Sequence, residues 1–358
     1  KWLAIGKTTA VKKRLAKQGT ILVMASATPG RATITTKAHE NAIISHHFMR
    51  VEPKRPEAAG WLYAFLKSSL GYAMVSGSQY ASIIRHIEPS HLTKIPVPDV
   101  DDETKARMNQ IMSRIVELRN LAASRTAAAE HVFHEALNPP TFTASEIGFS
   151  VSARAMLGGR RRLEAAYHAP AATAVVDAFD RSEPLQDLTK GVYWMSRFKR
   201  VYGDSGIPYL SADELFTINP QMNKRILVAP GDGHEKYFVE RDWIVMACSG
   251  QVYGLNGAAM LMTPYHERTF LSHDLIRIIP DKNKIRPGYL LTALTHPTLG
   301  RPVLIREAYG TSIPHLDPRD VARFPVVRLG DTVENRIADL AEEAARARAE
   351  ADEIERRM

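Results

Sequence analysis

The feature that most constrains this chain is an internal repeat, because a duplicated sequence predicts two units of similar fold. Eleven residues between 80 and 97 recur 229 positions later, between 309 and 326, as identical or chemically similar residues. The matched pairs include Tyr80 and Tyr309, His86 and His315, Pro89 and Pro318, and Pro96 and Pro325. The order of so many matches excludes chance similarity and indicates duplication.

Shorter matches extend the repeat toward the N-terminus. Phe48-Met49-Arg50-Val51 matches Leu275-Ile276-Arg277-Ile278, and Leu22-Val23-Met24-Ala25 matches Ile244-Val245-Met246-Ala247. The offset drifts from 222 to 229, as expected for diverged copies with loops of different length. These short apolar runs alternate with loops rich in Gly, Pro, Asn and Asp, which predicts β-strands at the core of each copy.

An apolar heptad pattern follows each copy and predicts a long helix over residues 101–137 and another over 331–358. The second pattern consists of Val333, Ile337, Leu340, Ala344, Ala347, Ala351, Ile354 and Met358. The matching positions of the first are Thr104, Met108, Ile111, Ile115, Leu118, Ala122, Arg125 and Ala129, extended by Val132 and Ala136. The first helix would be about 50 Å long and act as a spacer. We expect the helices to pair with each other; the alternative is that each packs on its own lobe.

The sequence therefore predicts an α+β protein of two mixed α/β lobes with β cores, joined by two long helices that pair as an antiparallel coiled coil. The first lobe has only 23 residues ahead of Met24, whereas 61 separate Leu185 from Met246, so we expect it to lack an opening segment of about 40 residues. The predicted parts are a first lobe at 1–100, a first helix at 101–137, a linker at 138–184 with a helical portion around 153–166, a second lobe at 185–330 and a second helix at 331–358.

Charge separates the lobes from the helices. The chain has a net charge of +8, yet residues 101–137 hold five Lys/Arg against six Asp/Glu, and 331–358 hold five against nine. The positive excess therefore belongs to the lobes, and it suits a partner made of phosphates. Charge alone is weak evidence, because many proteins without nucleic-acid partners are also mildly basic.

Two segments of the second lobe carry side chains suited to DNA. Ser249, Gln251 and Tyr253 lie in a glycine-rich loop after a strand, where Gln can read adenine and Ser or Tyr can hold phosphate. Arg197, Lys199 and Arg200 form a basic cluster beside Trp194 and Phe198, and the run at 160–162 is a weaker signal of the same kind. An ordinary turn and a solvated charged surface are the alternatives. The remaining candidate DNA contacts are Arg31, Thr311 and Ser312.

No pattern for catalysis or cofactor binding stands out. The segment 138–141 reads Asn-Pro-Pro-Thr, close to a methyltransferase tetrapeptide, but it follows a long helix and ends in Thr rather than an aromatic residue. Proline cannot continue a helix, so this segment predicts a helix stop. His46, His47 and His273 have no companions at metal-ligand spacing, and Cys248 is the one cysteine. We expect no cofactor and no metal. Without an apolar span or leader, we expect a cytoplasmic protein with no membrane partner.

The chain resembles the specificity (S) subunit of type I restriction-modification systems. The resemblance rests on residues 309–316, on the Ile/Phe-Pro-Val that closes each lobe, on the acid-led helices, and on residues 206–210 with the turn at Ser249-Gly250. It covers nearly all of the chain except the linker. The first lobe departs from the pattern at Ala81 and Ile83, where the second has Gly310 and Ser312.

The resemblance implies a non-catalytic protein with two target-recognition domains, each reading one half of a split site in double-stranded DNA. It also implies helices that dock modification (methyltransferase) subunits, two in number, with a restriction subunit as a further partner. Two alternatives stay open at this point: a coiled-coil interaction protein with no role on DNA, and a fragment of an adenine methyltransferase.

Overall fold

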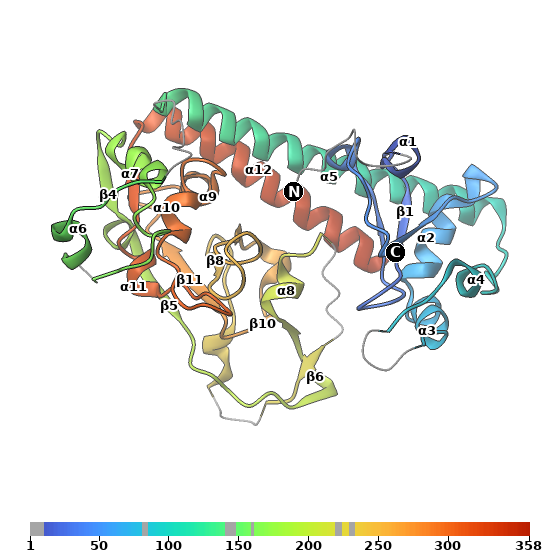
Figure 1. Cartoon of the computed structure of the whole chain (residues 1–358). Coiled ribbons are helices and arrows are strands. Elements are labelled where there is room, and N and C mark those ends of the chain that lie inside the picture. The colour runs from blue at the N-terminus through green and yellow to red at the C-terminus, as the bar shows by residue number, and fades with distance from the viewer. Residues whose placement is uncertain (1–10, 81–84, 140–147, 159–160, 219–223, 229–232) are drawn as a thin grey trace. The chain divides into compact units, whose positions relative to one another are not determined.

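The computed structural model describes residues 11–80, 85–139, 148–158, 161–218, 224–228 and 233–358 (Figure 1). The chain forms two compact units. Unit 1 comprises Lys1–Ala123 with Glu350–Met358, and unit 2 comprises Ser124–Ala349. Both helices and strands contribute to the described part, so the protein has a mixed α+β fold. No helix in that part is long and apolar enough to cross a membrane.

Unit 1 is built around a small antiparallel sheet with the strand order β2-β1-β3. Its strands are β1 (Ile21–Met24), β2 (Ala32–Ile34) and β3 (Phe48–Val51), and its short helices are α1 (Val11–Arg14), η2 (Lys37–His39), η3 (Pro56–Ala58), α2 (Ala59–Lys67), α3 (Ser69–Gly77) and α4 (Pro89–Leu92). The core of the unit forms where α2 covers the sheet, with Val23 and Tyr63 fully buried.

Unit 2 contains a four-stranded antiparallel sheet of order β5-β11-β8-β9, a three-stranded sheet β10-β6-β7 and the pair β12-β4. The strands are β4 (Ser182–Pro184), β5 (Thr189–Trp194), β6 (Tyr202–Leu210), β7 (Arg225–Ile226), β8 (Ile244–Ala247), β9 (Ala259–Leu261), β10 (Phe270–Leu271), β11 (Leu275–Pro280) and β12 (Pro325–Val327). The short helices are α6 (Ala153–Leu157), α7 (Pro170–Asp177), η4 (Leu185–Leu188), α8 (Ala212–Leu215), η5 (His234–Tyr237), η6 (Pro264–His266), α9 (Pro287–Thr295), α10 (Arg301–Ile305) and α11 (Pro318–Val321).

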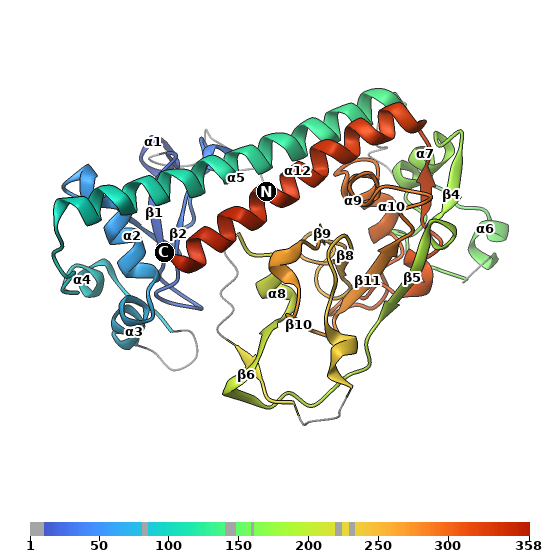
Figure 2. The ribbon, with the colours of Figure 1, turned by 180° about the vertical axis from the view of Figure 1, so that it is seen from behind.

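The two predicted long helices are present as α5 (Asp102–Leu137) and α12 (Asp331–Arg357). The Asp101 carboxylate accepts from the Thr104 backbone N–H at 2.7 Å and caps the start of α5. Within each unit a stretch of α5 lies beside a stretch of α12 (Figure 1, Figure 2). At its C-terminal end α5 buries Ala129 and Phe133 in the core of unit 2, whereas Ala136, predicted to extend the apolar pattern, is exposed.

Strand register repeats between the units. In unit 1, Leu22 of β1 lies opposite Arg50 of β3, and in unit 2 Val245 of β8 lies opposite Arg277 of β11. The match of β3 with β11 is therefore as predicted. The match of β1 with β8 was wrong by one residue, because Leu22 corresponds to Val245 rather than to Ile244. Four consecutive apolar residues without alternation do not specify a register.

Details of the chain path repeat as well. Thr36 and His39 form a capping box at η2, and Thr263 and His266 form the same box at η6. The bridge between Tyr80 and His86 recurs between Tyr309 and His315. The indole N–H of Trp61 donates to the carbonyl of Pro98 at 2.8 Å, and the equivalent Tyr289 hydroxyl donates to Val327 at 2.5 Å. The internal repeat in the sequence is thus a repeat of structure.

Each unit also packs a glycine against its long helix. A Cβ on Gly60 of α2 would lie 2.3 Å from the carbonyl carbon of Met108 in α5, and one on Gly288 of α9 would lie 2.5 Å from the Ala338 oxygen in α12. The backbone N–H of Gly60 donates to the Asn109 side chain at 2.6 Å. Both glycines therefore allow the lobe helix to touch the long helix backbone to backbone.

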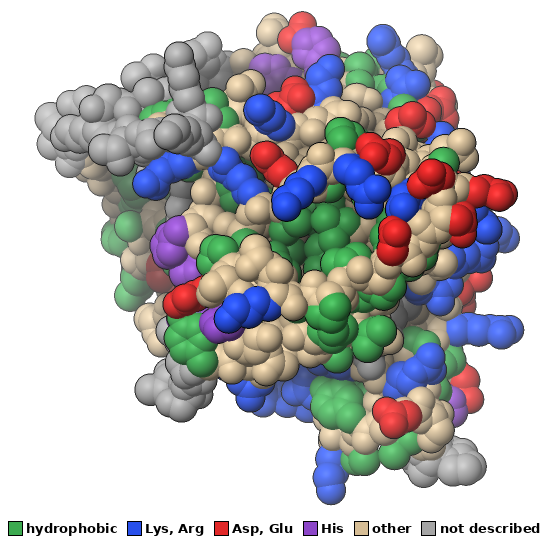
Figure 3. All heavy atoms as spheres, turned by 90° about the vertical axis from the view of Figure 1, so that its right-hand side faces the viewer, with side chains coloured by type: hydrophobic (Ala, Val, Ile, Leu, Met, Phe, Trp, Pro, Cys, Tyr) green, Lys and Arg blue, Asp and Glu red, His purple; other side chains and the backbone are tan. Residues whose placement is uncertain are grey.

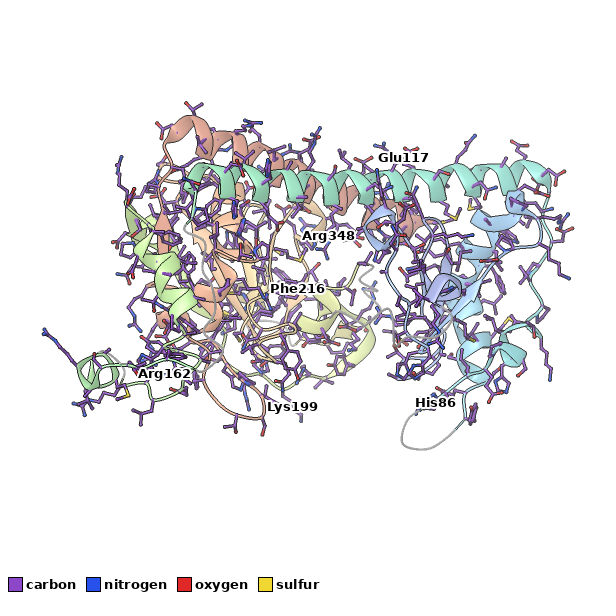
Figure 4. All side chains as sticks on the ribbon, turned by 45° about the horizontal axis from the view of Figure 1, so that its top comes forward. His86, Glu117, Arg162, Lys199, Phe216 and Arg348 are labelled. Carbon is purple, nitrogen blue, oxygen red and sulfur yellow. The ribbon has the colours of Figure 1, made fainter. Side chains whose placement is uncertain are left out.

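The predicted linker contains two short helices rather than one. The α6 helix covers the start of the portion predicted around 153–166, and α7 begins beyond it at Pro170. Arg162, part of the basic run, is buried and donates to the carbonyls of Glu307 at 3.0 Å and Ala308 at 2.7 Å (Figure 4). Arg162 therefore holds a structural position, and neither interpretation of this run, a DNA contact or a solvated surface charge, fits it. Arg160, and residues 140–141 of the Asn-Pro-Pro-Thr segment, lie outside the described residues.

A pH dependence follows from the second capping box. Burial lowers the pKa of His266 to about 4, and the Arg348 charge acts in the same direction. Between pH 6.5 and 4 the unfolded chain binds a proton that folded unit 2 does not, so stability falls as the pH falls through this window. We expect His266 to contribute a loss of up to about 3 kcal/mol.

The measurement is urea unfolding of the chain at pH 6.5 and at pH 4.5, for the wild type and for His266→Gln. The variant should lose less stability on acidification than the wild type, and His39→Gln, at the equivalent but half-exposed position, should behave like the wild type. Equal losses in all three proteins would contradict this role for His266.

Candidate nucleic-acid interface

Two loops of unit 2, residues 249–257 and 309–315, are tied together and are called the loop pair here. Ser249 Oγ lies 2.8 Å from His315 Nδ1, and these two residues also form a backbone bridge. The Pro314 carbonyl accepts from the Gly250 N–H at 3.2 Å and from the Asn256 side chain at 2.9 Å. The loops therefore hold each other in a fixed shape.

Arg301 at the start of α10 supports the first of these loops from within. Its guanidinium donates to the carbonyls of Gly254 at 2.8 Å and Asn256 at 2.9 Å. Burial lowers the pKa of Arg301. The hydrogen bonds from Arg301 to these backbone carbonyls fix the conformation of the loop. A recognition loop requires such rigid support from its scaffold.

The predicted side chains Gln251, Tyr253, Thr311 and Ser312 lie on the exposed side of the loop pair. Tyr253 is 77% exposed. The Gln251 amide nitrogen donates to the Ser312 carbonyl at 2.9 Å, which orients the amide. An amide group has two N–H donors and one oxygen acceptor, so Gln251 keeps a donor and the acceptor that a bidentate contact to adenine needs. The structure thus brings these four predicted residues together.

The predicted basic residues follow β5 on the same unit. Arg197, Lys199 and Arg200 are exposed, and Phe198 between them is anchored with its ring 4.7 Å from that of Tyr237 and 5.0 Å from that of Phe270. The Arg200 guanidinium donates to the Tyr209 hydroxyl at 3.2 Å. Lys199 lies on the side of unit 2 away from α5 (Figure 4). The aromatic anchor fixes the segment so that its cations face outward.

A pocket of about 360 Å³ joins the basic segment to the loop pair. It is lined by Trp194, Met195, Ser196, Arg197, Cys248, Ser249, His273, Asp274, Tyr309 and His315. Burial lowers the pKa of His273, whose Nε2 lies 3.4 Å from Asp274 Oδ1, and burial raises the pKa of the Cys248 thiol to about 11. The pocket offers imidazole and hydroxyl groups beside one arginine and one aspartate.

The sequence analysis did not identify His315 as a site residue. It interpreted His273 as a core or surface histidine with no role in a site. A usable signal was present, because His273 and His315 both fall at positions where the repeat keeps a histidine, His46 and His86. In unit 1 the equivalent Ser26 forms a backbone bridge with His86, and its Oγ lies 2.5 Å from Nδ1 of another histidine, His47.

The predicted contact Arg31 does not share a unit with the others. It lies in unit 1 just before β2, where its charge helps to lower the pKa of Lys67. Residues 81–84 of the first lobe, among them Ala81 and Ile83, lie outside the described residues. The equivalent loops of unit 1 can therefore be compared with the loop pair only where they contain Ser26, Tyr80 and His86.

The predicted helix-interface residues are buried to different degrees. Ile115, Leu118, Ile337 and Ala344 are buried, while Met108, Ile111, Leu340 and Ile354 are half-buried. Ile337 belongs to the core of unit 2 together with Ala338 and Ala341, so this face packs on the lobe. Sequence reasoning missed a buried ionic cluster in unit 1.

That cluster joins α5, α12 and α2. Glu355, which is 3% exposed, accepts from Arg119 and from the hydroxyl of Tyr63, and Lys67 Nζ lies 3.8 Å from its carboxylate. Arg119 also contacts Asp352 at 3.5 Å. Burial lowers the pKa of Lys67 to about 8, an effect that the Glu355 charge opposes. The C-terminal end of α12 is thus held in unit 1 by buried charges.

No family model and no curated protein matches this sequence. Several solved structures, however, are similar to the chain. The chain is similar to the S subunit of a type I restriction-modification system from M. genitalium, at 14% identity and a TM-score of 0.40, over 96% of this chain and 81% of that one. Three of its structural neighbours come from type I restriction-modification systems.

The other two of these structural neighbours also come from type I restriction-modification systems. The HsdS subunit from Thermoanaerobacter tengcongensis is 15% identical with a TM-score of 0.27, over 96% of this chain and 80% of that chain. A chain from a structure describing complex assembly and conformational transition of the type I R-M system is 12% identical with a TM-score of 0.31, over 95% and 80%. These neighbours are members of the family that the sequence resembles.

Proposed function

We propose that this chain is the sequence-specific DNA-recognition subunit of a type I restriction-modification complex. Each lobe would read one half of a bipartite site, and the long helices would set the distance between the halves and dock two methyltransferase subunits, with a restriction subunit as a further partner. The chain itself would be non-catalytic, and the complex would modify the DNA.

The observation that carries the proposal is the loop pair of unit 2 with its exposed polar side chains. Loops braced by Arg301 and by the Ser249–His315 contact present Gln251 outward, next to the cations at 197–200. Base edges are read by fixed polar side chains, and phosphates are held by cations placed beside them. The same chain path recurs in unit 1, which supports two reading lobes.

The helices support the spacer role. In unit 1, Arg119 of α5 contacts Glu355 and Asp352 near the end of α12, and in unit 2 Arg125 contacts Glu343 at 2.8 Å. The later residue of α5 thus meets the earlier residue of α12, as in an antiparallel pair. We propose that the two helices form an antiparallel coiled coil, whose remaining acidic surface docks the modification subunits.

The test uses the full chain and duplexes that carry its target site. Gln251→Ala should reduce discrimination at one base pair by about 1–3 kcal/mol. Arg200→Ala should weaken binding to every duplex by a similar factor and make the salt dependence shallower by about 0.9 in the slope of log K against log salt. Arg336→Ala, on the exposed face of α12, is the matched control and should change neither quantity.

Fluorescence anisotropy at several salt concentrations measures both effects. If Gln251→Ala and Arg200→Ala leave preference and affinity unchanged, the assigned interface is wrong. Affinity for duplex DNA that stays flat from low to high salt favours an interaction protein without a role on DNA, and binding of S-adenosylmethionine by the chain favours a methyltransferase fragment.

A further inference from the structure

The pocket of about 360 Å³ beside the loop pair, called the histidine pocket here, lies close to a buried cation. Arg277 of β11 is 0% exposed, and its charge acts on the lining residues His273 and Cys248. Its guanidinium donates to backbone carbonyls, among them those of Leu275 at 3.1 Å and Leu271 at 3.3 Å, and it contacts no carboxylate in the described part of the chain. Burial lowers the pKa of Arg277 to about 10. A buried cation without a carboxylate partner is costly, so its charge favours an anion nearby.

The charges that act on His273 are also mainly positive. Burial is the main cause of its lowered pKa, and the charges of Arg197, Arg200 and Arg277 lower it further. Asp274 acts in the opposite direction, with its Oδ1 3.4 Å from His273 Nε2. Three guanidinium groups and one carboxylate therefore surround the ring, and this part of the pocket is electropositive.

The other polar groups of the histidine pocket are donors that carry no negative charge. Ser196, Arg197 and Tyr309 line the pocket and are exposed, so they lie at its mouth. The Cys248 thiol stays protonated because burial raises its pKa to about 11. His315 is held against Ser249 of the loop pair. Donors around an electropositive hollow suit a small anion with several oxygen atoms, and a phosphodiester is one.

The internal repeat keeps the residues of this pocket in unit 1. Ser249, His273, Arg277 and His315 correspond to Ser26, His46, Arg50 and His86. His46 and Arg50 line one hollow of unit 1, and Ser26 forms a backbone bridge with His86 as Ser249 does with His315. Histidine side chains also reach the surface on the side of the molecule where α2 and α4 lie, beside side chains of both charges (Figure 3). Retention of this combination in both copies favours a shared role.

We propose that the histidine pocket binds one phosphodiester group of a DNA backbone, and that His273 takes up a proton from solvent when the phosphate enters. The phosphate charge balances Arg277 and Arg197 and favours the charged form of the imidazole ring. His273 Nδ1 has no hydrogen-bond partner in the described part of the chain, so a proton added there breaks no existing hydrogen bond. This inference rests on the proposed role on DNA and adds a proton-linked phosphate site to it.

The expected pH dependence is a gain in affinity for DNA as the pH falls. In the free chain the pKa of His273 is lowered from its ordinary value of 6.5, so the ring is uncharged near neutral pH. A bound phosphate raises the pKa of His273, because its negative charge stabilises the imidazolium. Between the two pKa values the DNA-bound chain binds more protons than the free chain, and affinity rises as the pH falls through that window.

The test measures binding of the full chain to duplex DNA of two unrelated sequences by fluorescence anisotropy, at pH 8 and at pH 6. Contacts to phosphate do not depend on base sequence, so any duplex can serve as the probe. From pH 8 to pH 6 the affinity of the wild type should rise about threefold more than that of His273→Gln. At pH 8 the two proteins should bind alike. His131→Gln, at an exposed position of α5, is the matched control and should keep the wild-type pH profile.

A second variant, Asp274→Asn, has an effect of the opposite sign. It keeps the size of the side chain and removes the one carboxylate of the histidine pocket, so it should tighten binding at pH 8 by about threefold. Damage to the fold would weaken binding instead, and the direction of the change therefore separates the two explanations. Calorimetry in two buffers of different ionisation heat should show proton uptake on DNA binding that His273→Gln lacks.

Several results would overturn the proposal. One is a wild type that binds DNA with the expected salt dependence but has the pH profile of His273→Gln, which would leave the role on DNA standing. Another is an equal loss of affinity for His273→Gln at both pH values, which is the result of a structural role. An effect confined to one of the two sequences would assign the pocket to a base.

Inorganic phosphate alone provides the last arm of the experiment. Proton uptake with inorganic phosphate, at the concentration of phosphate groups in the DNA titration, would assign the pocket to the free anion and overturn the proposal. The proposal predicts no such uptake, because the neighbouring contacts of the duplex hold the phosphodiester in place. A wild type that binds no duplex at either pH would contradict both this inference and the proposed role on DNA.

Discussion

Replacing Glu355 by alanine is expected to lower the free energy of unfolding of unit 1 by about 3–5 kcal/mol, because it removes the closer of the two carboxylates that the buried Arg119 contacts. Glu355 also accepts from Tyr63 and lies 3.8 Å from Lys67, so three side chains lose contact with the same carboxylate. A buried charge without a partner costs far more than an exposed one.

The matched control is Glu353→Ala on the same helix. Glu353 has 41% of its side chain exposed and pairs only locally with Arg357, so its loss should cost less than about 1 kcal/mol. Urea unfolding followed by circular dichroism measures both values. Similar losses for the two variants would show that the cluster does not hold α12 in unit 1.

The second large effect is expected from Gly288→Ala. The added Cβ would lie 2.5 Å from the Ala338 oxygen, which is a backbone atom, so α9 or α12 must shift. We expect a loss of about 3 kcal/mol in unit 2, at the upper end of what overpacking usually costs. Gly60→Ala should act in the same way in unit 1, against Met108 of α5.

Gly77→Ala is the control for these two variants. Gly77 ends α3, and a Cβ there would meet no atom within 4 Å. The stability of the Gly77→Ala variant should stay unchanged or rise slightly, because alanine reduces the conformational freedom of the unfolded chain. Thermal unfolding of the three variants decides the matter: if Gly288→Ala is as stable as Gly77→Ala, the close helix contact is absent in solution.

The sequence predicted the parts of the fold that depend on periodicity and repetition. Both long helices begin and end within a residue or two of the prediction, and β3 and β11 correspond as matched. The match of β1 with β8 slipped by one residue, since an apolar run buried on both faces has no alternation to fix its register.

Side-chain environments were harder to predict. Arg119, Asp352 and Glu355 have the composition of a solvated helix surface, and the packing of α5, α12 and α2 in unit 1 buries them. Arg162 lies in a run of arginines that suits DNA, yet two backbone carbonyls hold it in the interior. Burial of a charged residue depends on contacts between distant segments, which a local pattern does not contain.

The candidate site was predictable where residues share a loop. Ser249, Gln251 and Tyr253 are near neighbours in sequence, and Thr311 and Ser312 were predicted as further DNA contacts. The pocket at His273 and His315 was not predicted, because it forms where segments at the ends of β5, β8 and β11 meet the loop at 309–315. Arg31, predicted as another DNA contact, lies in the other unit.

The most direct test of the central claim is the pattern of methylated bases in the genome of the host cell, with and without the gene for this chain. Two reading lobes held apart by helices predict a two-part motif with a gap of fixed length, and this motif should lose its methylation when the gene is deleted and regain it when the gene is restored. A genome in which every methylated motif survives the deletion would contradict the account.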